Sequence, residues 1–242
     1  MVFHYRQKKP KPSDIPKIKI NGVPVERVTQ FNFLGITLDE SMSWQSHVNK
    51  ICNKMNKIIG IMNKQKHFLP SFILKQIYDS FILPHINYGI TCWGFNIKRV
   101  EKIQKRAVRI INKSKYNAHT DPLFKKLGIL KAQDIFTLNC LKLYHKFCSN
   151  SLPSYFDHLI QSVPHQYSTR STILYHERNR TTGAARRFRC HLVKILESIP
   201  ENIKQKINTH SLKGFTHYFC NLQIEKYPII CSIEKCYVCS RL

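Results

Sequence analysis

The stretch Phe31–Trp44, FNFLGITLDESMSW, contains a change from strand to helix around which the rest of the chain is organised. An apolar run is broken by Gly35 and stops at the turn-forming residues Asp39–Ser41. Ser43 then occupies the position of a helix N-cap, directly before a long helical pattern. We therefore predict a strand that leads into a helix, and Gly35 marks either a bulge or a site where another backbone approaches closely.

The residues before this stretch predict an irregular connection followed by a small antiparallel unit. Residues 1–16 are basic and contain several prolines after a short strand at Met1–Tyr5, and a chain that opens in this way is typical of a piece of a longer protein. The pair Asn21–Gly22 is a strong signal for a two-residue hairpin turn, and Pro24 favours an edge strand. The antiparallel unit is expected to end at Leu38.

Three amphipathic helical patterns follow and predict a small helical bundle. The first covers residues 44–67, the second covers Ser71–Leu83 and the third covers Ile97–Asn112. Pro84 should close or kink the second helix, and Trp93 in the linker is expected to plug the core rather than to stack on bases. The residues expected to face inward are Phe72, Ile73, Ile77, Tyr78, Phe81 and Ile82 in the second helix, and Val100, Ile103, Ala107, Val108 and Ile111 in the third.

The second half of the chain adds shorter helices, so the predicted fold is mainly α with a short N-terminal β-hairpin. A capped helix that ends at Gly128 should be followed by a longer one at Lys131–Ser149. A short helical piece is expected at Phe156–Ile160, after the turn in LPSYF. The final helices are predicted at Ala184–Leu196 and Ser211–Leu222, with Pro200 between them.

The charge of the chain indicates a polyanionic partner. Among 242 residues, 39 are lysine or arginine and 14 are aspartate or glutamate, which gives a formal net charge of +25. An excess of this size indicates nucleic acid, here RNA, an RNA–DNA duplex or DNA, and a merely soluble basic protein is the alternative. No apolar run is long enough to span a bilayer and the N-terminus has no signal-peptide pattern. We therefore expect an intracellular location, cytoplasmic or nuclear, with no secretion and no membrane partner.

Two basic segments contain the expected contacts with phosphate. The predicted third helix is basic outside its apolar stripe, with Glu101 as its single acid, whereas an ordinary solvated face would mix both signs. Residues 162–190 interleave arginine with aromatic residues, a pattern that can bind single-stranded nucleic acid through phosphate contacts and stacking. The alternative is that this segment is a loosely packed arm. The candidate nucleic-acid-binding residues are Lys98, Arg99, Lys102, Lys105, Arg106 and Arg109 in the helix, Lys113 directly after it, and Arg170, Arg186, Arg187 and Arg189 in the later segment.

No self-sufficient catalytic constellation is recognisable in the sequence. Nucleotidyl transfer needs carboxylates that converge on paired Mg²⁺, and the adjacent acidic pair Asp39–Glu40 is explained by a turn and a helix start. The pattern Cys236-x-x-Cys239 has the spacing of metal ligands, and Cys220 and Cys231 could complete a zinc site. Because the chain has only this one C-x-x-C pair, a cysteine-containing tail without metal is the favoured interpretation, and no cofactor is expected in this chain.

Several segments in a fixed order resemble the carboxy-terminal part of the reverse transcriptases of jockey-type non-LTR (LINE) retrotransposons. They are FNFLGITLDESMSWQSHVNKICNKMNKIIGIM, LPSFILKQIYDSFILPHINYGITCWG, VEKIQKRAVRIIN and HTDPLFKKLGILKAQDI, followed by LPSYF, HQYSTRST and RNRTTGAARRFR. The resemblance covers about residues 1–222. It implies that Phe33, Leu34 and Gly35 belong to a hairpin that grips the primer terminus, and that the helices up to Asn112 form a thumb beside the primer–template duplex.

The resemblance also implies that the catalytic aspartates, and the Mg²⁺ that they bind, lie in a palm upstream of this chain. The expected division is a palm-derived hairpin at 1–42, a thumb-like bundle at 43–116, a helical connection at 117–161, a basic region at 162–222 and a cysteine-containing tail at 223–242. We interpret the chain as a fragment of a retrotransposon RNA-directed DNA polymerase that binds primer–template or RNA and is inactive alone. The alternatives are a free-standing basic nucleic-acid-binding helical protein with a host role and a small zinc-dependent interaction protein built on the tail.

Overall fold

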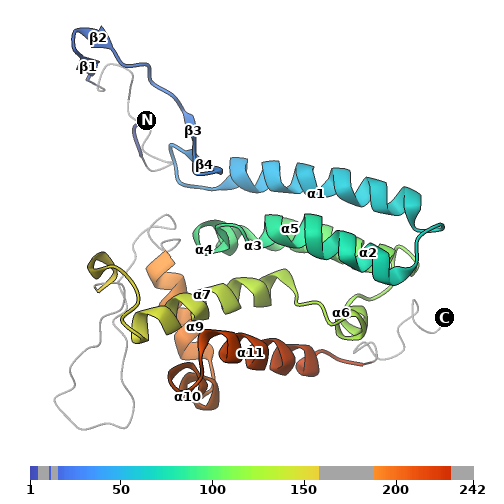
Figure 1. Ribbon diagram of the computed structural model, residues 1–242. Coiled ribbons are helices and arrows are strands. Elements are labelled where there is room, and N and C mark those ends of the chain that lie inside the picture. Colours follow the sequence, from blue (N-terminus) through green and yellow to red (C-terminus); the bar gives the residue numbers. More distant parts are fainter. Residues whose placement is uncertain (5–10, 12–15, 158–187, 230–242) are drawn as a thin grey trace.

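The structure is a computed structural model and describes residues 1–4, 11, 16–157 and 188–229 (Figure 1). Two short antiparallel hairpins lie near the start of the chain, and helices make up most of the rest of the described residues. The predicted class, mainly α with a short N-terminal β-hairpin, is confirmed, and a second hairpin is added to it. Within the described ranges, no helix combines the length and the apolar character that a membrane crossing requires.

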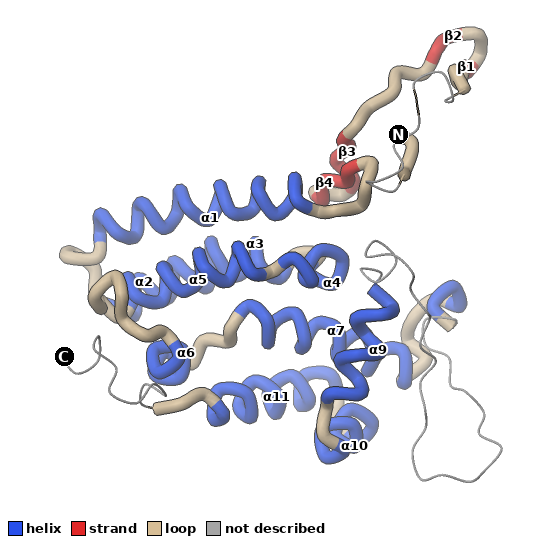
Figure 2. Tube along the Cα trace, turned by 180° about the vertical axis from the view of Figure 1, so that it is seen from behind, coloured by secondary structure: helices blue, strands red, loops and turns tan. Residues whose placement is uncertain are grey.

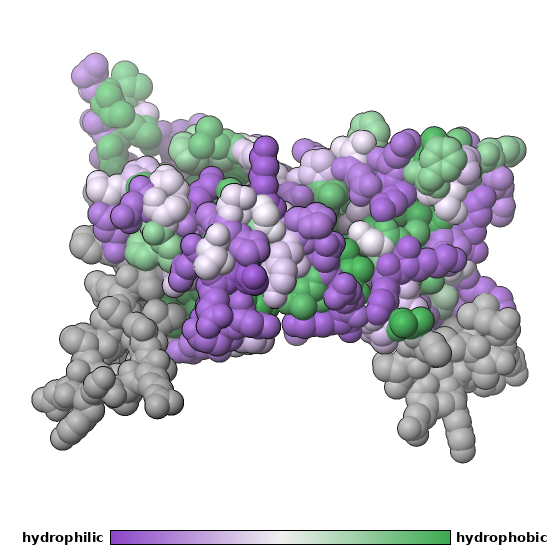
Figure 3. Space-filling model, turned by 60° about the horizontal axis from the view of Figure 1, so that its bottom comes forward, coloured by the Kyte–Doolittle hydropathy of each residue, from purple (hydrophilic) through white to green (hydrophobic). Residues whose placement is uncertain are grey.

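The first hairpin pairs β1 (Lys19–Ile20) with β2 (Val23–Pro24) and projects from the helical body. Its turn residues Asn21 and Gly22 have φ of 50° and 82°, as a two-residue type I′ turn requires. The hairpin predicted at this pair is therefore confirmed. Hydrophobic side chains gather on the projection (Figure 3), where Ile18, Ile20, Val23 and Val25 are all exposed.

The second hairpin corrects the interpretation of Gly35. β3 (Gln30–Phe33) pairs with β4 (Ile36–Asp39), so the apolar run forms two strands rather than one broken strand. Leu34 and Gly35 form the turn between them, with φ of 46° and 78°. The bulge interpretation is wrong, because both positive φ values belong to a two-residue hairpin turn, and glycine adopts such a φ without strain.

The helix expected after this hairpin is α1 (Gln45–Gln65), and its apolar stripe is buried. Ser43 is not its N-cap, contrary to the prediction. The N-cap is Trp44, which has φ of 62° and makes no side-chain capping bond. The Ser43 hydroxyl nevertheless accepts a long hydrogen bond of 3.4 Å from the N–H of Gln45, the first residue of the helix, and it donates to the Asp39 carboxylate at 2.9 Å.

The second predicted helix continues past Pro84 by means of a π-turn. α2 (Ser71–Ile77) is followed by the π-helical segment η2 (Tyr78–Ile82) and then by α3 (Leu83–Asn87). The N–H of Leu83 donates to the carbonyl of Tyr78, five residues earlier. This wider turn accommodates a proline, which has no N–H to donate and would clash with the carbonyl of a regular helix.

Two aromatic residues of this segment face outward, which corrects the prediction that they face inward. Phe72 and Phe81 are 64% and 59% exposed. Leu74 takes the buried position of α2, and the π-turn adds a residue to one turn of helix and so moves Phe81 out of the core. Ile73 and Ile77 are half-buried.

The linker that leads to the third predicted helix is buried around Trp93. α4 (Ile90–Trp93) and η3 (Gly94–Asn96) precede α5 (Lys98–Ile111). Trp93 is fully buried and donates through Nε1 to a backbone carbonyl at 3.0 Å, so its predicted role as a core residue is confirmed. The apolar residues predicted to face inward in α5 are all buried, and Gln104 is buried among them.

Two helices of the middle of the chain agree closely with the prediction. They are α6 (Asp121–Leu127) and α7 (Ala132–Cys148), and Gly128 ends the first of them with φ of 62°. The helical piece predicted at Phe156–Ile160 lies mostly outside the described residues. Its start is the end of a 3₁₀ turn, η4 (Ser154–Phe156).

The described carboxy-terminal part contains one helix more than predicted. α9 (Phe188–Ser198) and α11 (Leu212–Lys226) correspond to the two expected helices, although the predicted start at Ala184 lies outside the described residues. Between them lies α10 (Glu201–Thr209), where the prediction placed only Pro200. Proline precedes this helix as its N-cap, because its fixed φ suits the start of a helix as well as a break.

The chain just after α11 is fixed to the body. Tyr227 is buried, and its hydroxyl donates to the carboxylate of Asp134 and accepts from the backbone N–H of Lys131 at 3.0 Å. The Lys125 amine donates to the carbonyl of Tyr227 at 2.9 Å. One buried cluster therefore extends through the described residues from Val48 in α1 to this tyrosine.

The helices are stacked in layers below α1 (Figures 1 and 2). α2 and α5 lie below α1, α7 lies below them, and α11 forms the opposite side of the body, with α9 and α10 at one end. The second hairpin lies at the amino end of α1. The outward faces of α1 and α5 are exposed, and the candidate interface lies there.

Candidate nucleic-acid interface

The residues expected to grip a primer form the tip of the second hairpin. Phe33 and Leu34 are exposed, and Leu34 and Gly35 make the turn. The hydroxyl of Tyr88 donates to the carbonyl of Leu34, and the ring of Tyr88 would lie 3.4 Å from a Cβ placed on Gly35. The close approach at this glycine therefore comes from a tyrosine ring at the end of α3, which holds the tip in place.

The other side of this hairpin is bound to α1. The hydroxyl of Thr37 donates to Oδ1 of Asn32 at 2.7 Å, and the Lys50 amine donates to that hydroxyl at 3.0 Å. The backbone N–H of Thr37 donates to Nδ1 of His47 at 3.2 Å. Burial, together with the charges of Lys50 and Lys54, lowers the pKa of His47, so its ring is neutral and accepts this bond.

Two arginines of α5 are bonded to two asparagines of α1 where the helices meet. Nη1 of Arg99 donates to Oδ1 of Asn49, and Nη1 of Arg106 donates to Oδ1 of Asn56 at 3.2 Å. The two arginines are two turns apart on α5 and the two asparagines are two turns apart on α1, so the helices run parallel and in register. We call these four residues the α1–α5 seam.

The predicted basic residues of the third helix divide into exposed and engaged ones. Lys105 pairs with Glu101, the single acid of α5, at 2.9 Å. Arg109 is half-buried, donates through Nε to the carbonyl of Ala118 at 2.7 Å, and has its pKa lowered by burial. Arg109 therefore holds the loop after α5. The exposed cations are Lys98, Arg99, Lys102, Arg106 and Lys113, and we call these five the basic row.

Helix α1 contributes the two amides of the seam and has exposed cations of its own. Lys54, Lys57 and Lys64 are exposed on it. Sequence reasoning missed the partners of the arginines, Asn49 and Asn56, because an isolated asparagine on an exposed helix face carries no signal of its own. The signal that could have found them is their spacing, which repeats the seven-residue spacing of the two arginines.

The remaining candidate residues lie on other elements or outside the described part of the chain. Arg189 lies in the first turn of α9 and is half-buried. Cys220 is a half-buried free thiol in α11, and among the residues that the structure describes no group of three or more His, Cys, Asp or Glu could hold a metal ion. Outside the described residues lie Arg170, Arg186, Arg187, Cys231, Cys236 and Cys239.

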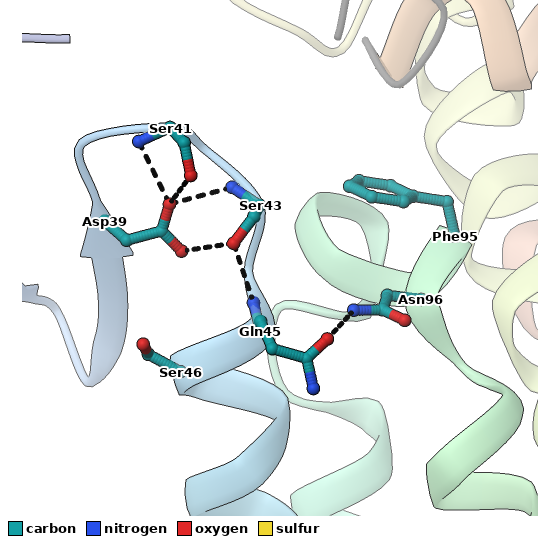
Figure 4. Close-up of a pocket in the computed structure, with 7 residues that line it drawn as sticks. All are labelled: Asp39, Ser41, Ser43, Gln45, Ser46, Phe95 and Asn96. Atoms are coloured by element: carbon teal, nitrogen blue, oxygen red, sulfur yellow. Dashed lines mark hydrogen bonds between the residues drawn. The ribbon is translucent and has the colours of Figure 1, made fainter. Parts of the chain in front are cut away.

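A pocket of about 440 Å³ opens at the amino ends of α1 and α5 (Figure 4). The Asp39 carboxylate at its edge accepts hydrogen bonds of 2.8 to 3.1 Å from the N–H and hydroxyl groups of Ser41 and Ser43. Burial opposes ionisation, but these bonds hold the pKa of Asp39 below its ordinary value. The lining residues are Asp39, Ser41, Ser43, Gln45, Ser46, Phe95 and Asn96.

Comparison with known proteins agrees with the sequence resemblance. The chain is similar to RNA-directed DNA polymerases of transposable elements, so its resemblance to jockey-type reverse transcriptases is confirmed. It is 26% identical over 120 residues to a probable RNA-directed DNA polymerase from transposon BS of Drosophila melanogaster, a match that covers 46% of this chain. It is 23% identical over 144 residues to the RNA-directed DNA polymerase from mobile element jockey of Drosophila funebris, which covers 55% of this chain.

A third relative shows the same partial overlap. The probable RNA-directed DNA polymerase from transposon X-element of Drosophila melanogaster is 24% identical over 128 residues, or 49% of this chain. The three matches cover 13%, 14% and 15% of the respective relatives, so the similar region is about one seventh of each polymerase. No protein-family model and no solved structure match the chain.

Proposed function

We propose that this chain is the part of a retrotransposon RNA-directed DNA polymerase that holds nucleic acid, and that it binds primer–template duplex or RNA along α5 and α1. The observation that carries the proposal is the basic row, in which five cations are exposed while the single acid of α5 is neutralised by Lys105. Two of these cations, Arg99 and Arg106, are also held in fixed positions by their asparagine partners.

The chemistry of the row suits phosphate better than bases. Lysine and arginine contacts to phosphate position a duplex without reading its sequence. α5 has 14 residues, so it is about 21 Å long and can follow about six steps of a nucleic-acid strand. Arginines whose rotamers are already fixed lose less conformational freedom on binding than free side chains.

We propose further that the catalytic carboxylates belong to another part of the polymerase. The adjacent acidic pair of the chain does not fit a magnesium site, since each carboxylate is engaged within the protein. Asp39 holds the turn before α1, and Glu40 accepts from Arg27 at 2.9 Å and lies 3.3 Å from His4. The genomic sequence directly upstream of the Met1 codon tests this: we expect an intact or decayed Y/F-A-D-D motif, and clean promoter sequence would contradict it.

The binding proposal is tested by measuring the affinity of the full chain for RNA–DNA hybrid and for double-stranded DNA over a range of salt concentrations. We expect the logarithm of the association constant to fall linearly with the logarithm of salt concentration. The variant with Lys102→Glu and Arg106→Glu should bind at least about tenfold more weakly, and its salt slope should be smaller by about two, one unit for each phosphate contact removed.

A matched variant separates the basic row from total charge. Lys126→Glu with Lys213→Glu makes the same change in net charge at exposed positions on α6 and α11. It should bind almost as well as the unmodified chain. Equal losses in the two variants, or an affinity that does not respond to salt, would contradict the proposal that α5 is the phosphate-binding element.

A further inference from the structure

The pocket at the amino ends of α1 and α5 lies at one end of the basic row. Asn96 lines the pocket, and α5 begins two residues later with Lys98 and Arg99. A strand whose phosphates lie along α5 would therefore present its next nucleotide to the pocket. The volume of about 440 Å³ falls within the range of about 300–1,000 Å³ that is typical of sites for small organic groups.

Two carboxamides in the pocket are held in fixed orientations. Nδ2 of Asn96 donates to Oε1 of Gln45 at 3.1 Å, and Nε2 of Gln45 donates to Oδ1 of Asn49 at 3.0 Å. Asn49 is itself a member of the seam, so this chain of bonds links the pocket to Arg99. No described residue bonds to Oδ1 of Asn96, which leaves one acceptor and one N–H of this amide for the edge of a base.

Phe95 supplies a flat apolar wall. Its ring is stacked on the ring of His191, with centroids 5.3 Å apart and planes within 6° of parallel. The ring extends into the pocket toward Ser43, across from the turn that precedes α1 (Figure 4). An aromatic ring that is already supported by a second ring offers a planar ligand a stacking surface whose position is fixed.

The charge of the pocket favours a neutral ligand. Asp39 is ionised and all four of its hydrogen bonds come from the two serines of its own turn, so it repels phosphate and has little capacity left to bind a cation. A nucleobase is planar, uncharged and carries donors and acceptors at its edge, as the stacked ring and the oriented amide require.

We propose that this pocket binds a single unpaired nucleobase at the end of the nucleic-acid strand whose phosphates lie on the basic row. Phe95 stacks on the base and Asn96 bonds to its edge, with Gln45 as the residue that positions Asn96. The inference rests on the proposed function, because the strand is delivered by α5. The pocket adds to the proposed function a site that favours duplex ends with an unpaired base over blunt duplex ends.

The test compares the affinity of the full chain for a blunt duplex and for the same duplex with one unpaired 2-aminopurine at a 3′ end. The overhang should improve binding about tenfold, since stacking of one base on an aromatic residue contributes from severalfold to about a hundredfold. Binding should also change the fluorescence of the 2-aminopurine, which responds to stacking. Phe95→Leu and Asn96→Ala should each remove most of this advantage.

The controls separate this site from the proposed function. Phe72→Leu, at an exposed aromatic position on α2, should keep the whole advantage of the overhang. Salt-dependent binding of both duplexes with no preference for the overhang would overturn the pocket alone, whereas no binding of either duplex would overturn the proposed function as well.

Discussion

Replacing Gln104 tests how strongly the core depends on one buried amide. Gln104 is fully buried in α5 and uses its whole carboxamide. Nε2 donates to the hydroxyl of Tyr78 and to the carbonyl of Leu130, both at 2.8 Å, and Oε1 accepts from the N–H of Ala132 at 2.8 Å. This one side chain thus joins α5 to the π-turn and to the first turn of α7.

The substitution Gln104→Leu keeps the size of the side chain and leaves two buried polar groups and one partly buried carbonyl without their partner. Each such group costs about 1–3 kcal/mol. Because the leucine variant no longer has to bury a polar amide, the desolvation cost of that amide disappears and offsets part of this loss. We expect the free energy of unfolding to fall by at least about 3 kcal/mol, which is a large fraction of the 5–15 kcal/mol that is typical of a folded domain. Tyr78→Phe removes only one partner and should cost about 1 kcal/mol.

Urea unfolding of the full chain, followed by the fluorescence of its two tryptophans, the buried Trp93 and the half-buried Trp44, measures both losses. Gln205→Leu, the same change at an exposed position of α10, should stay within about 0.5 kcal/mol of the unmodified chain. In a double-mutant cycle, Gln104→Leu and Tyr78→Phe should cost less together than the sum of the single losses. A loss of unfolding free energy below about 1 kcal/mol for Gln104→Leu would refute the argument that no other group can take over the three hydrogen bonds of the Gln104 carboxamide.

Three further predictions concern the turn, the core and pH. Leu34→Asn should stabilise the second hairpin by up to about 1 kcal/mol, because Asn tolerates the positive φ of 46°, and slower hydrogen exchange in β3 and β4 measures it. Gly94→Ala should destabilise the protein by about 1–3 kcal/mol or more, since the added Cβ would lie 2.2 Å from the Phe136 ring, and a lower midpoint in thermal unfolding measures it. In the folded chain the pKa of His47 is lowered from its ordinary value of 6.5. As the pH falls, His47 is therefore protonated in the unfolded chain before it is protonated in the folded chain, and the free energy of unfolding decreases. His47→Gln should reduce this dependence between about pH 7 and 5, and an unchanged slope of unfolding free energy against pH would contradict the assignment.

The long helices were predictable because their patterns repeat. The apolar positions of α1 and α5 recur with the period of a helix over several turns, and both stripes are buried as expected. The π-turn at Tyr78–Ile82 was not predictable from the same reasoning, since the 3.6-residue period assumes a regular helix. Phe81 was therefore assigned to the wrong face, and Pro84, which was expected to close or kink the helix, lies in a helical segment that continues past it.

Polar residues were harder to place than apolar ones. Gln104 lies within the apolar stripe of α5, but its hydrogen-bond partners belong to α7 and to the π-turn, which are distant in sequence, so the local pattern could not predict its bonds. Of the candidate site, the exposure of the basic row follows from amphipathic periodicity, whereas the bonds of Arg99 and Arg106 to α1 depend on how two helices meet. The pocket was not predicted at all, because its walls come from two segments about 50 residues apart.

The parallel course of α1 and α5 has an electrostatic consequence. Aligned peptide dipoles give each helix about half a positive charge at its amino end and about half a negative charge at its carboxyl end. Both amino ends lie at the pocket, where the ionised Asp39 cancels their sum of about one charge. Lys64 in the last turn of α1 and Arg109 in the last turn of α5 offset the opposite poles in the same way. The helix dipoles therefore leave little net charge at either end of the seam, and the field along it is set by the charged side chains of the basic row.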